Sequence, residues 1–127
     1  MHFDLLIRNG TCVTPWGQQA TDVGVSRSLI VTLSAAPADT ADKVIDASGL
    51  HVLPGLIDSH VHLRDPGDPA VETLSTGTRA AVLGGIATVF DMPNTNPPIV
   101  DQERLDWKRH YAEQQSWCDI GLYIAGA

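Results

Sequence analysis

Hydrophobic and polar residues alternate over short stretches in the first 53 residues, a pattern typical of β-strands that bury one face. The stretches expected to form strands are residues 3–7, 11–14, 20–25, 29–33 and 43–47. Asn9-Gly10 lies between the first two stretches, and this dipeptide tolerates the positive φ angles of a tight two-residue turn. We therefore expect a β-hairpin over residues 3–14, then further short strands, and no helix before residue 54.

The pattern changes after Pro54-Gly55, where an apolar strand is expected to begin at residue 56 and to end in polar residues at His62. Asp68-Pro69 resembles an N-cap followed by proline at the first helical position. This predicts a helix that starts there and stops at Gly84-Gly85. Val71, Leu74, Thr78 and Val82 recur at helical spacing within it.

A second strand and a second helix follow. Residues 86–90 are nearly all apolar and rich in β-formers, as expected for a buried parallel strand. Asp101 is expected to cap a helix that runs to about residue 116, and residues 120–124 to form a third strand. The expected amphipathic face of the helix includes Leu105, Lys108 and Ala112, with Trp107 and Tyr111 stacked one turn apart.

This alternation of strands and helices predicts an α/β fold with a parallel sheet. We expect two parts, residues 1–53 and residues 54–127. A complete (β/α)8 barrel takes about 250 residues, whereas this chain supplies two and a half strand–helix units. We therefore expect a truncated barrel whose third strand has no helix to cover it.

Composition narrows the classes of function. Of the 127 residues, 43% are hydrophobic and 18% are charged, as in a globular protein. Eight Lys and Arg against fifteen Asp and Glu give a net charge of −7. This balance argues against nucleic acid or an anionic membrane as the main partner, because both attract basic surfaces. A local cationic pocket for an anionic small molecule stays compatible with it.

The sequence also favours a soluble, cytoplasmic protein. The first residues have no basic stretch followed by an apolar core, so we expect no signal peptide. The longest uncharged runs, residues 28–38 and 80–90, fall short of the ~20 residues that span a bilayer. Cys12 and Cys118 are far apart in the sequence, which favours reduced thiols over a disulfide.

His60 and His62 are the strongest candidates for metal ligands. Residues i and i+2 of a strand point to the same face, so both imidazoles can reach one ion. They also follow an apolar strand, and parallel α/β folds build their sites at the carboxyl ends of strands. A His-x-His pair alone is a weak motif, and the alternative is two ordinary polar loop residues. His2, His51 and His110 are not expected to complete the site.

Arg64 and Asn94 are candidates for binding an anionic substrate. Arg64 follows His62 by two residues, and its planar guanidinium suits bidentate binding of a carboxylate. The alternative for Arg64 is a surface ion pair with Asp65 or Asp68. Asn94 lies in a proline-rich loop after the second strand, where its amide can donate and accept hydrogen bonds. The alternative for Asn94 is that it holds a turn.

Two motifs together carry a specific resemblance. Residues 54–67, PGLIDSHVHLRDPG, resemble the metal-binding signature of dihydroorotases, which are cyclic amidohydrolases of the amidohydrolase superfamily. Residues 91–95, DMPNT, resemble the second dihydroorotase block at the expected distance. The strand-rich start resembles the small β-sandwich that accompanies the barrel in this family. The resemblance covers essentially the whole chain but only about the first third of a complete enzyme. Ser26-Arg27-Ser28 departs from it, because many relatives have a glycine-containing turn there.

The resemblance implies a small β-sandwich followed by the start of a TIM-type (β/α)8 metal-dependent hydrolase barrel. It implies zinc, one or two ions in the complete enzyme, with His60 and His62 as ligands, and Arg64 and Asn94 as binders of the substrate carboxylate. The general acid and base are expected beyond Ala127, so Asp65 and Asp91 are not assigned to catalysis. The implied reaction interconverts dihydroorotate and N-carbamoyl-aspartate in pyrimidine biosynthesis, through zinc-activated hydroxide. The implied partners are a second copy of the chain and an aspartate carbamoyltransferase.

Three alternatives stay open. An allantoinase or hydantoinase shares the His-x-His pair, but its substrates generally lack the ring carboxylate that Arg64 would bind. A noncatalytic dihydroorotase-like subunit would support an aspartate carbamoyltransferase, and intact His60 and His62 count against it. Finally, the chain by itself is expected to be an inactive piece of a longer enzyme.

Overall fold

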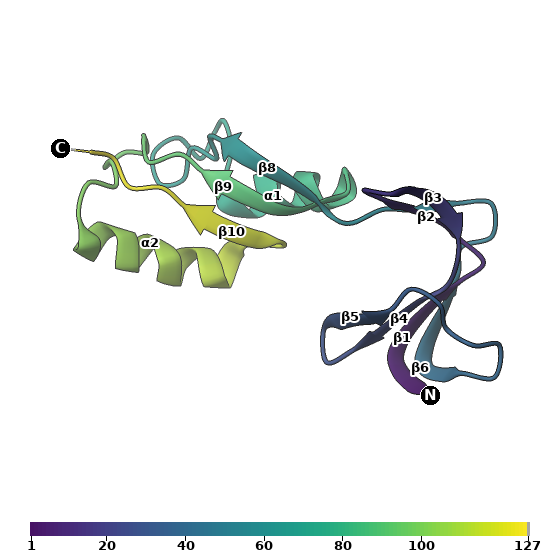
Figure 1. Ribbon diagram of the computed structural model, residues 1–127. Helices are drawn as coiled ribbons and strands as arrows, with labels where there is room; N and C mark the ends of the chain where they lie inside the picture. Colours follow the sequence, from purple (N-terminus) through teal and green to yellow (C-terminus); the bar gives the residue numbers. More distant parts are fainter. Residues whose placement is uncertain (127) are drawn as a thin grey trace. The chain divides into compact units, whose positions relative to one another are not determined.

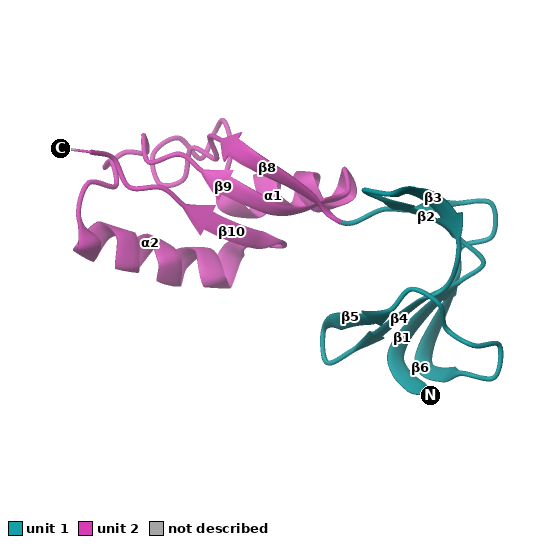
Figure 2. Cartoon of the chain, in the orientation of Figure 1, with its two compact units in different colours: residues 1–54 teal, residues 55–127 magenta. Residues whose placement is uncertain are grey.

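A computed structural model describes residues 1–126 (Figure 1). The chain divides into two compact units, Met1–Pro54 and Gly55–Ala127 (Figure 2). The first unit contains strands alone, and the second alternates strands with helices. The chain is therefore a mixed α/β protein, as the sequence pattern predicted.

The first unit forms two small sheets. Its strands are β1 (His2–Arg8), β2 (Thr11–Thr14), β3 (Gly17–Ala20), β4 (Val23–Ser26), β5 (Leu29–Thr32), β6 (Thr40–Asp46) and β7 (His51–Val52). One sheet has the order β5-β4-β1-β6 and the other the order β3-β2-β7. The side chains of Phe3, Leu6 and Val23 are buried in the first sheet, and Cys12 is buried in the second.

The predicted hairpin over residues 3–14 is wrong. β1 pairs with β4 and β6, whereas β2 pairs with β3 and β7, so the two strands lie in different sheets. Asn9 does adopt a positive φ of 62°. Its backbone N–H donates to Asp22 Oδ1 at 2.9 Å, and its side-chain amide donates to Asp46 Oδ1 at 2.9 Å. These long-range contacts direct the chain into a second sheet instead of folding it back on β1.

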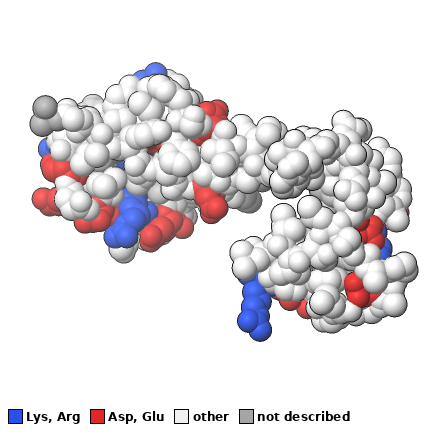
Figure 3. All heavy atoms as spheres, in the orientation of Figure 1, with Lys and Arg blue, Asp and Glu red and all other residues white. Residues whose placement is uncertain are grey.

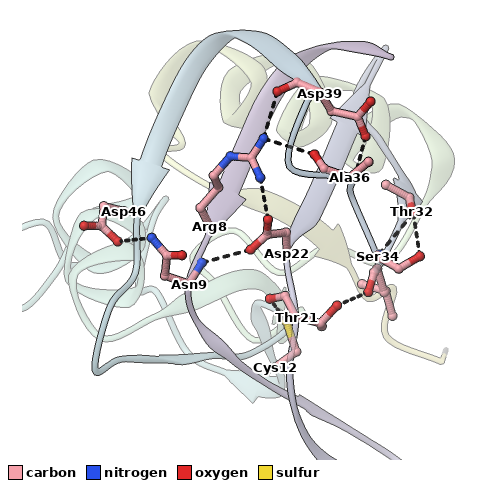
Figure 4. A network of polar contacts seen from close by, with 11 residues as sticks. Arg8, Asn9, Cys12, Thr21, Asp22, Thr32, Ser34, Ala36, Asp39 and Asp46 are labelled. Atoms are coloured by element: carbon pink, nitrogen blue, oxygen red, sulfur yellow. Dashed lines mark hydrogen bonds and ion pairs between the residues drawn. The ribbon is translucent and has the colours of Figure 1, made fainter.

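A polar network around Arg8 stabilises this crossing (Figure 4). Arg8 Nη1 donates to Asp22 Oδ2 at 2.7 Å, and Nη2 donates to the carbonyl oxygen of Asp39 at 2.8 Å. Asp22 lies between β3 and β4, so the expected single strand over residues 20–25 is interrupted there. The guanidinium therefore joins the end of β1 to two loops that are distant in sequence.

The second unit contains β8 (Leu56–Val61), α1 (Leu74–Leu83), β9 (Ile86–Asp91), α2 (Gln102–Gln115) and β10 (Asp119–Leu122). The three strands form a parallel sheet in the order β10-β9-β8. Asp91 pairs with Val61 on one side and with Leu122 on the other, so the carboxyl ends of the three strands lie together. The described residues form an open sheet, and the closed barrel stays a prediction.

Helices and sheet of the second unit meet in one apolar core. Its buried members are Leu63, Leu74, Val89 and Ala112. Val61, Ala81, Ile86, Tyr111, Cys118 and Ile120 pack against them. Burial raises the pKa of the Cys118 thiol, with a further contribution from the charge of Asp119. Both Cys118 and Cys12 are free thiols, as expected.

Helix α1 begins at Leu74, six residues after Asp68, so the predicted start at Asp68-Pro69 is wrong. Thr73 is the N-cap, and a reciprocal capping box joins it to Thr76, whose N–H donates to Thr73 Oγ1 at 3.1 Å. The Asp68 carbonyl accepts hydrogen bonds from Val71 and Glu72 in a turn that does not continue as a helix. The capping box at Thr73 therefore sets the start of the helix, and Asp68-Pro69 forms only a turn before it.

The other helix boundaries were predicted correctly. Gly84 caps the end of α1, and Gly85 has a φ of +84°. Asp101 caps α2, since its Oδ1 accepts a hydrogen bond from Arg104 N at 2.8 Å. Of the four residues at helical spacing, Leu74 and Thr78 are fully buried, whereas Val71 and Val82 are exposed. Within residues 1–126, no helix has the length and apolar character needed to cross a membrane.

Candidate metal centre

The candidate metal ligands lie at the carboxyl end of β8. His60 is the fifth residue of this strand, and His62 follows its last residue. The two imidazole rings lie on the same side, with centroids 5.2 Å apart and planes inclined at 60°. Both side chains are exposed, so a bound ion is accessible to a small molecule. The two rings are therefore close together, as the i, i+2 spacing predicts, although His62 itself lies just beyond the strand.

Asn94 contacts one of these histidines directly. The Nδ1 atom of His62 lies 2.7 Å from Asn94 Oδ1. An amide oxygen only accepts hydrogen bonds, so Nδ1 is the donor and the lone pair of the imidazole lies at Nε2. Metal-binding histidines usually donate their second ring nitrogen to such a partner, which fixes the ring and its tautomer. The arrangement of His62 therefore fits a metal ligand that coordinates through Nε2.

The donor set fits part of a zinc site. Imidazole nitrogens are common zinc ligands, and a catalytic site normally has three protein ligands and a water. Within residues 1–126, no third His, Cys, Asp or Glu joins His60 and His62 in a metal-binding group. His110 is exposed on α2, and His2 contacts Thr40 and Asp42 in the first unit. The described residues thus bring together two imidazoles that could serve as zinc ligands.

Arg64 lies where the chain leaves β8. Its side chain is exposed and its φ is 55°, a left-handed conformation that is uncommon for residues other than glycine. The Arg64 carbonyl accepts a hydrogen bond from Asp68 N at 2.8 Å, which closes a turn after the histidines. The structure gives Arg64 no ion pair among residues 1–126. Its guanidinium is therefore available to a ligand.

The loop after β9 is tied to the loop after β8. Met92 N donates to the Val61 carbonyl at 2.9 Å, and Asn96 N donates to the Pro66 carbonyl at 2.9 Å. Gly67 lies against this contact, because a Cβ at Gly67 would come within 3.1 Å of Asn96 N. These backbone contacts hold Asn94 opposite His62.

Asp91 is a buried acid that supports the same loop. Its side chain is 0% exposed, its Oδ1 accepts a hydrogen bond from Leu63 N at 3.0 Å, and its Oδ2 pairs with Lys108 Nζ. The Lys108 side chain is 1% exposed. Lys108 was expected on the amphipathic face of its helix, whereas its partner Asp91 was not predicted. A lysine at helical spacing from Ala112, together with an aspartate ending an apolar strand, is the signal that could have found this pair.

Asp65 is the second buried acid. Its Oδ2 accepts hydrogen bonds from Leu74 N at 2.9 Å and from the Tyr111 hydroxyl at 3.2 Å. Burial, followed by the negative charge of Asp65, raises the pKa of Tyr111. Tyr111 also stacks on Trp107, as predicted, with ring centroids 5.4 Å apart and an angle of 9°. Both buried acids are thus occupied by donors from the protein itself.

The surface charge agrees with the acidic composition of the chain. The face shown in Figure 3 carries acidic side chains beside the few basic ones, and no broad basic patch appears on it. This matches the net charge of −7. Extended phosphate backbones bind to clustered Lys and Arg, which this face lacks.

Comparison with known proteins gives a consistent picture. A family model described as dihydro-orotase-like matches residues 49–125. An allantoinase from Deinococcus radiodurans is 41% identical over 124 residues, which are 97% of this chain and 28% of the relative. A dihydroorotase from Pyrococcus abyssi is 43% identical over 106 residues, which are 82% of this chain and 26% of the relative.

Solved structures agree with these relatives. The L-hydantoinase (dihydropyrimidinase) from Arthrobacter aurescens is similar at a TM-score of 0.88 and 32% identity, over 96% of this chain and 28% of that protein. A D-hydantoinase is similar at a TM-score of 0.81 and 30% identity. The chain spans little more than a quarter of the length of these proteins. The family model covers more than half of the chain, and the chain belongs to the dihydro-orotase-like family.

Proposed function

We propose that the chain forms the first part of the active site of a cyclic amidohydrolase, an enzyme that hydrolyses the C–N bond of a cyclic amide. The observation that carries this proposal is the pair of imidazoles 5.2 Å apart at the carboxyl end of β8, one of them oriented by Asn94. The relatives are named dihydroorotase, allantoinase and hydantoinase, which supports the same class of reaction.

His60 and His62 would hold zinc. A zinc ion in such a site lowers the pKa of water toward neutrality and polarises a carbonyl group. The residues of this chain would hold the zinc ion and orient its ligands. His62 presents its Nε2 atom because Asn94 engages Nδ1. The remaining ligands and the proton shuttle would come from residues outside 1–126, so we propose that the chain alone does not hydrolyse a cyclic amide.

The first substrate that we propose is dihydroorotate, opened to N-carbamoyl-aspartate in pyrimidine biosynthesis. The exposed guanidinium of Arg64 supports it, because Arg64 has no ion pair among the described residues and can bind the ring carboxylate in bidentate geometry. Asn94 can donate to the carboxylate through its side-chain N–H groups while its Oδ1 accepts from His62. A cytoplasmic homo-oligomer, with an aspartate carbamoyltransferase as a further partner, completes this proposal.

Allantoin or a hydantoin is the second candidate substrate. Asn94 fits it equally: its Oδ1 accepts a hydrogen bond from His62, and its side-chain N–H groups stay free to donate to a ring carbonyl. Similarity to an allantoinase over 97% of the chain supports it as well. The two candidates differ chemically in the ring carboxylate.

The deciding experiment uses the protein encoded by the complete gene, loaded with zinc. Its kcat/KM is measured for dihydroorotate, allantoin and hydantoin, and its zinc content is measured in parallel. A preference for dihydroorotate of a hundredfold or more would support the first candidate. A preference for allantoin or hydantoin would support the second, and no hydrolysis of any of them by zinc-loaded protein would refute the proposed reaction class.

A further inference from the structure

Two buried carboxylates hold the backbone on both sides of Arg64. On one side, Asp91 Oδ1 accepts a hydrogen bond from the Leu63 N–H at 3.0 Å. On the other side, the side chain of Asp65 is fixed by Leu74 N at 2.9 Å. Leu63 and Asp65 are 4% and 8% exposed, although Arg64 between them is exposed. The segment thus alternates anchored and exposed residues.

Both carboxylates receive a second donor from one helix. Lys108 and Tyr111 are three residues apart on α2, so their side chains lie on the same face of the helix. Lys108 Nζ pairs with Asp91 Oδ2, and the Tyr111 hydroxyl donates to Asp65 Oδ2 at 3.2 Å. The Trp107 ring stacks on Tyr111 and restricts its orientation. One helix face therefore reaches both anchors of the Arg64 segment.

We propose that Lys108 and Tyr111 are positioning residues for the candidate site. Through Asp91 and Asp65 they set the backbone of residues 62–65, and with it the directions of His62 and Arg64. The consequence for substrate binding rests on the proposed function, whereas the consequence for the backbone does not. Small displacements of a binding group are costly, because a misplacement of about 1 Å can reduce a rate by about a hundredfold.

The charge of Lys108 stabilises the buried carboxylate of Asp91, which holds the Leu63 N–H. A carboxylate that is fully buried needs a charged partner, and removing one member leaves the other uncompensated. In Lys108→Met, the buried carboxylate of Asp91 would lose its charged partner, the side chain would rearrange, and its hydrogen bond to the Leu63 N–H would weaken. Tyr111→Phe removes one hydroxyl and leaves the ring stacking and the packing in place. The two variants thus test the two anchors separately.

The first readout is amide hydrogen exchange in the protein from the complete gene, followed by mass spectrometry of a peptide that covers residues 60–66. We expect exchange of this peptide to rise at least tenfold in Lys108→Met and severalfold in Tyr111→Phe. Arg109→Met is the matched control, since Arg109 is on the same helix but forms an exposed pair with Asp106. We expect exchange of the peptide in this control to equal that of the parent protein.

The second readout is steady-state kinetics with the preferred cyclic amide. We expect KM to rise about tenfold in Tyr111→Phe, with kcat changed less than threefold and zinc content unchanged, because ground-state positioning is lost. A merely structural role would lower the melting temperature and leave KM of the folded enzyme unchanged. If Lys108→Met does not fold, Tyr111→Phe decides by both readouts.

The two proposals fail in different ways. Unchanged exchange of the 60–66 peptide in folded Tyr111→Phe and Lys108→Met, or an equal rise in Arg109→Met, would overturn the positioning role whatever the enzyme hydrolyses. A parent protein that hydrolyses no cyclic amide would refute the proposed function, and the exchange experiment would still decide the positioning role.

Discussion

His62 Nδ1 lies 2.7 Å from Asn94 Oδ1, and this contact joins the carboxyl ends of two neighbouring parallel strands. It assigns to Asn94 an orienting role toward the candidate metal ligand, in addition to the substrate-binding role that the sequence suggests. The relationship also sets the free lone pair of His62 at Nε2.

Asn94→Ala is expected to weaken zinc binding about tenfold to a hundredfold, as is common when the hydrogen-bond partner of a metal-binding histidine is removed. Zinc affinity is measured by competition with a coloured chelator. Asn96→Ala serves as the matched control, because Asn96 lies two residues further along the same loop and contacts Pro66 through its backbone. Equal zinc affinity in Asn94→Ala and the parent protein would contradict the orienting role.

His60→Ala and His62→Ala are each expected to abolish zinc retention during dialysis, because each removes one imidazole ligand from the proposed site. The zinc content of the complete protein is measured by atomic emission after dialysis against a weak chelator. His110→Ala, which alters an exposed residue of α2, should retain zinc like the parent protein. Full zinc content in either of the first two variants would place the metal elsewhere.

Arg64→Ala is expected to lower kcat/KM for dihydroorotate about a hundredfold, because a charge-assisted bidentate contact to the carboxylate is lost. Zinc content should stay nearly intact. Hydantoin, which has no ring carboxylate, is the control substrate, and its turnover should change little. An equal loss on both substrates would mean that Arg64 supports the fold of the loop and does not bind the carboxylate.

Ser28→Gly is expected to stabilise the first unit. Arg27 and Ser28 join β4 to β5 with φ angles of 50° and 62°, a conformation that suits a two-residue hairpin turn but favours glycine. We expect the free energy of unfolding to rise by about 0.5–1 kcal/mol, measured by denaturation in urea. Ser26→Gly, within β4, should instead destabilise by about the same amount.

The environment of Tyr111 predicts a dependence of stability on alkaline pH. Burial and Asp65 raise the pKa of Tyr111 in the folded protein above its ordinary value of about 10. Its contribution is therefore fully present below pH 10 and is lost as the pH rises from there through the folded pKa. The free energy of unfolding should fall less steeply above pH 10 in Tyr111→Phe than in the parent protein. If the free energy of unfolding fell equally steeply with pH in the two proteins, the raised pKa of Tyr111 would be contradicted.

The position of α1 shows why some boundaries could not be predicted from local signals. Asp68-Pro69 and Thr73 both carry capping chemistry, and the competition is decided by which residues reach the core. Leu74, directly after Thr73, is fully buried, whereas Val71 is 68% exposed. The helix therefore begins where its first apolar side chain can pack, a condition that depends on Leu63 and Ala112 from distant parts of the chain.

The sequence by itself determined the alternation of strands and helices after residue 54, the stops at Gly84 and Ser116, and the pairing of His60 with His62 on one side. These features depend on local periodicity and capping, which act within a few residues. Tertiary structure alone decided that β1 and β2 enter different sheets, and that Lys108 reaches Asp91. Such contacts join residues far apart in sequence, and a buried charge is tolerated only where folding supplies its partner.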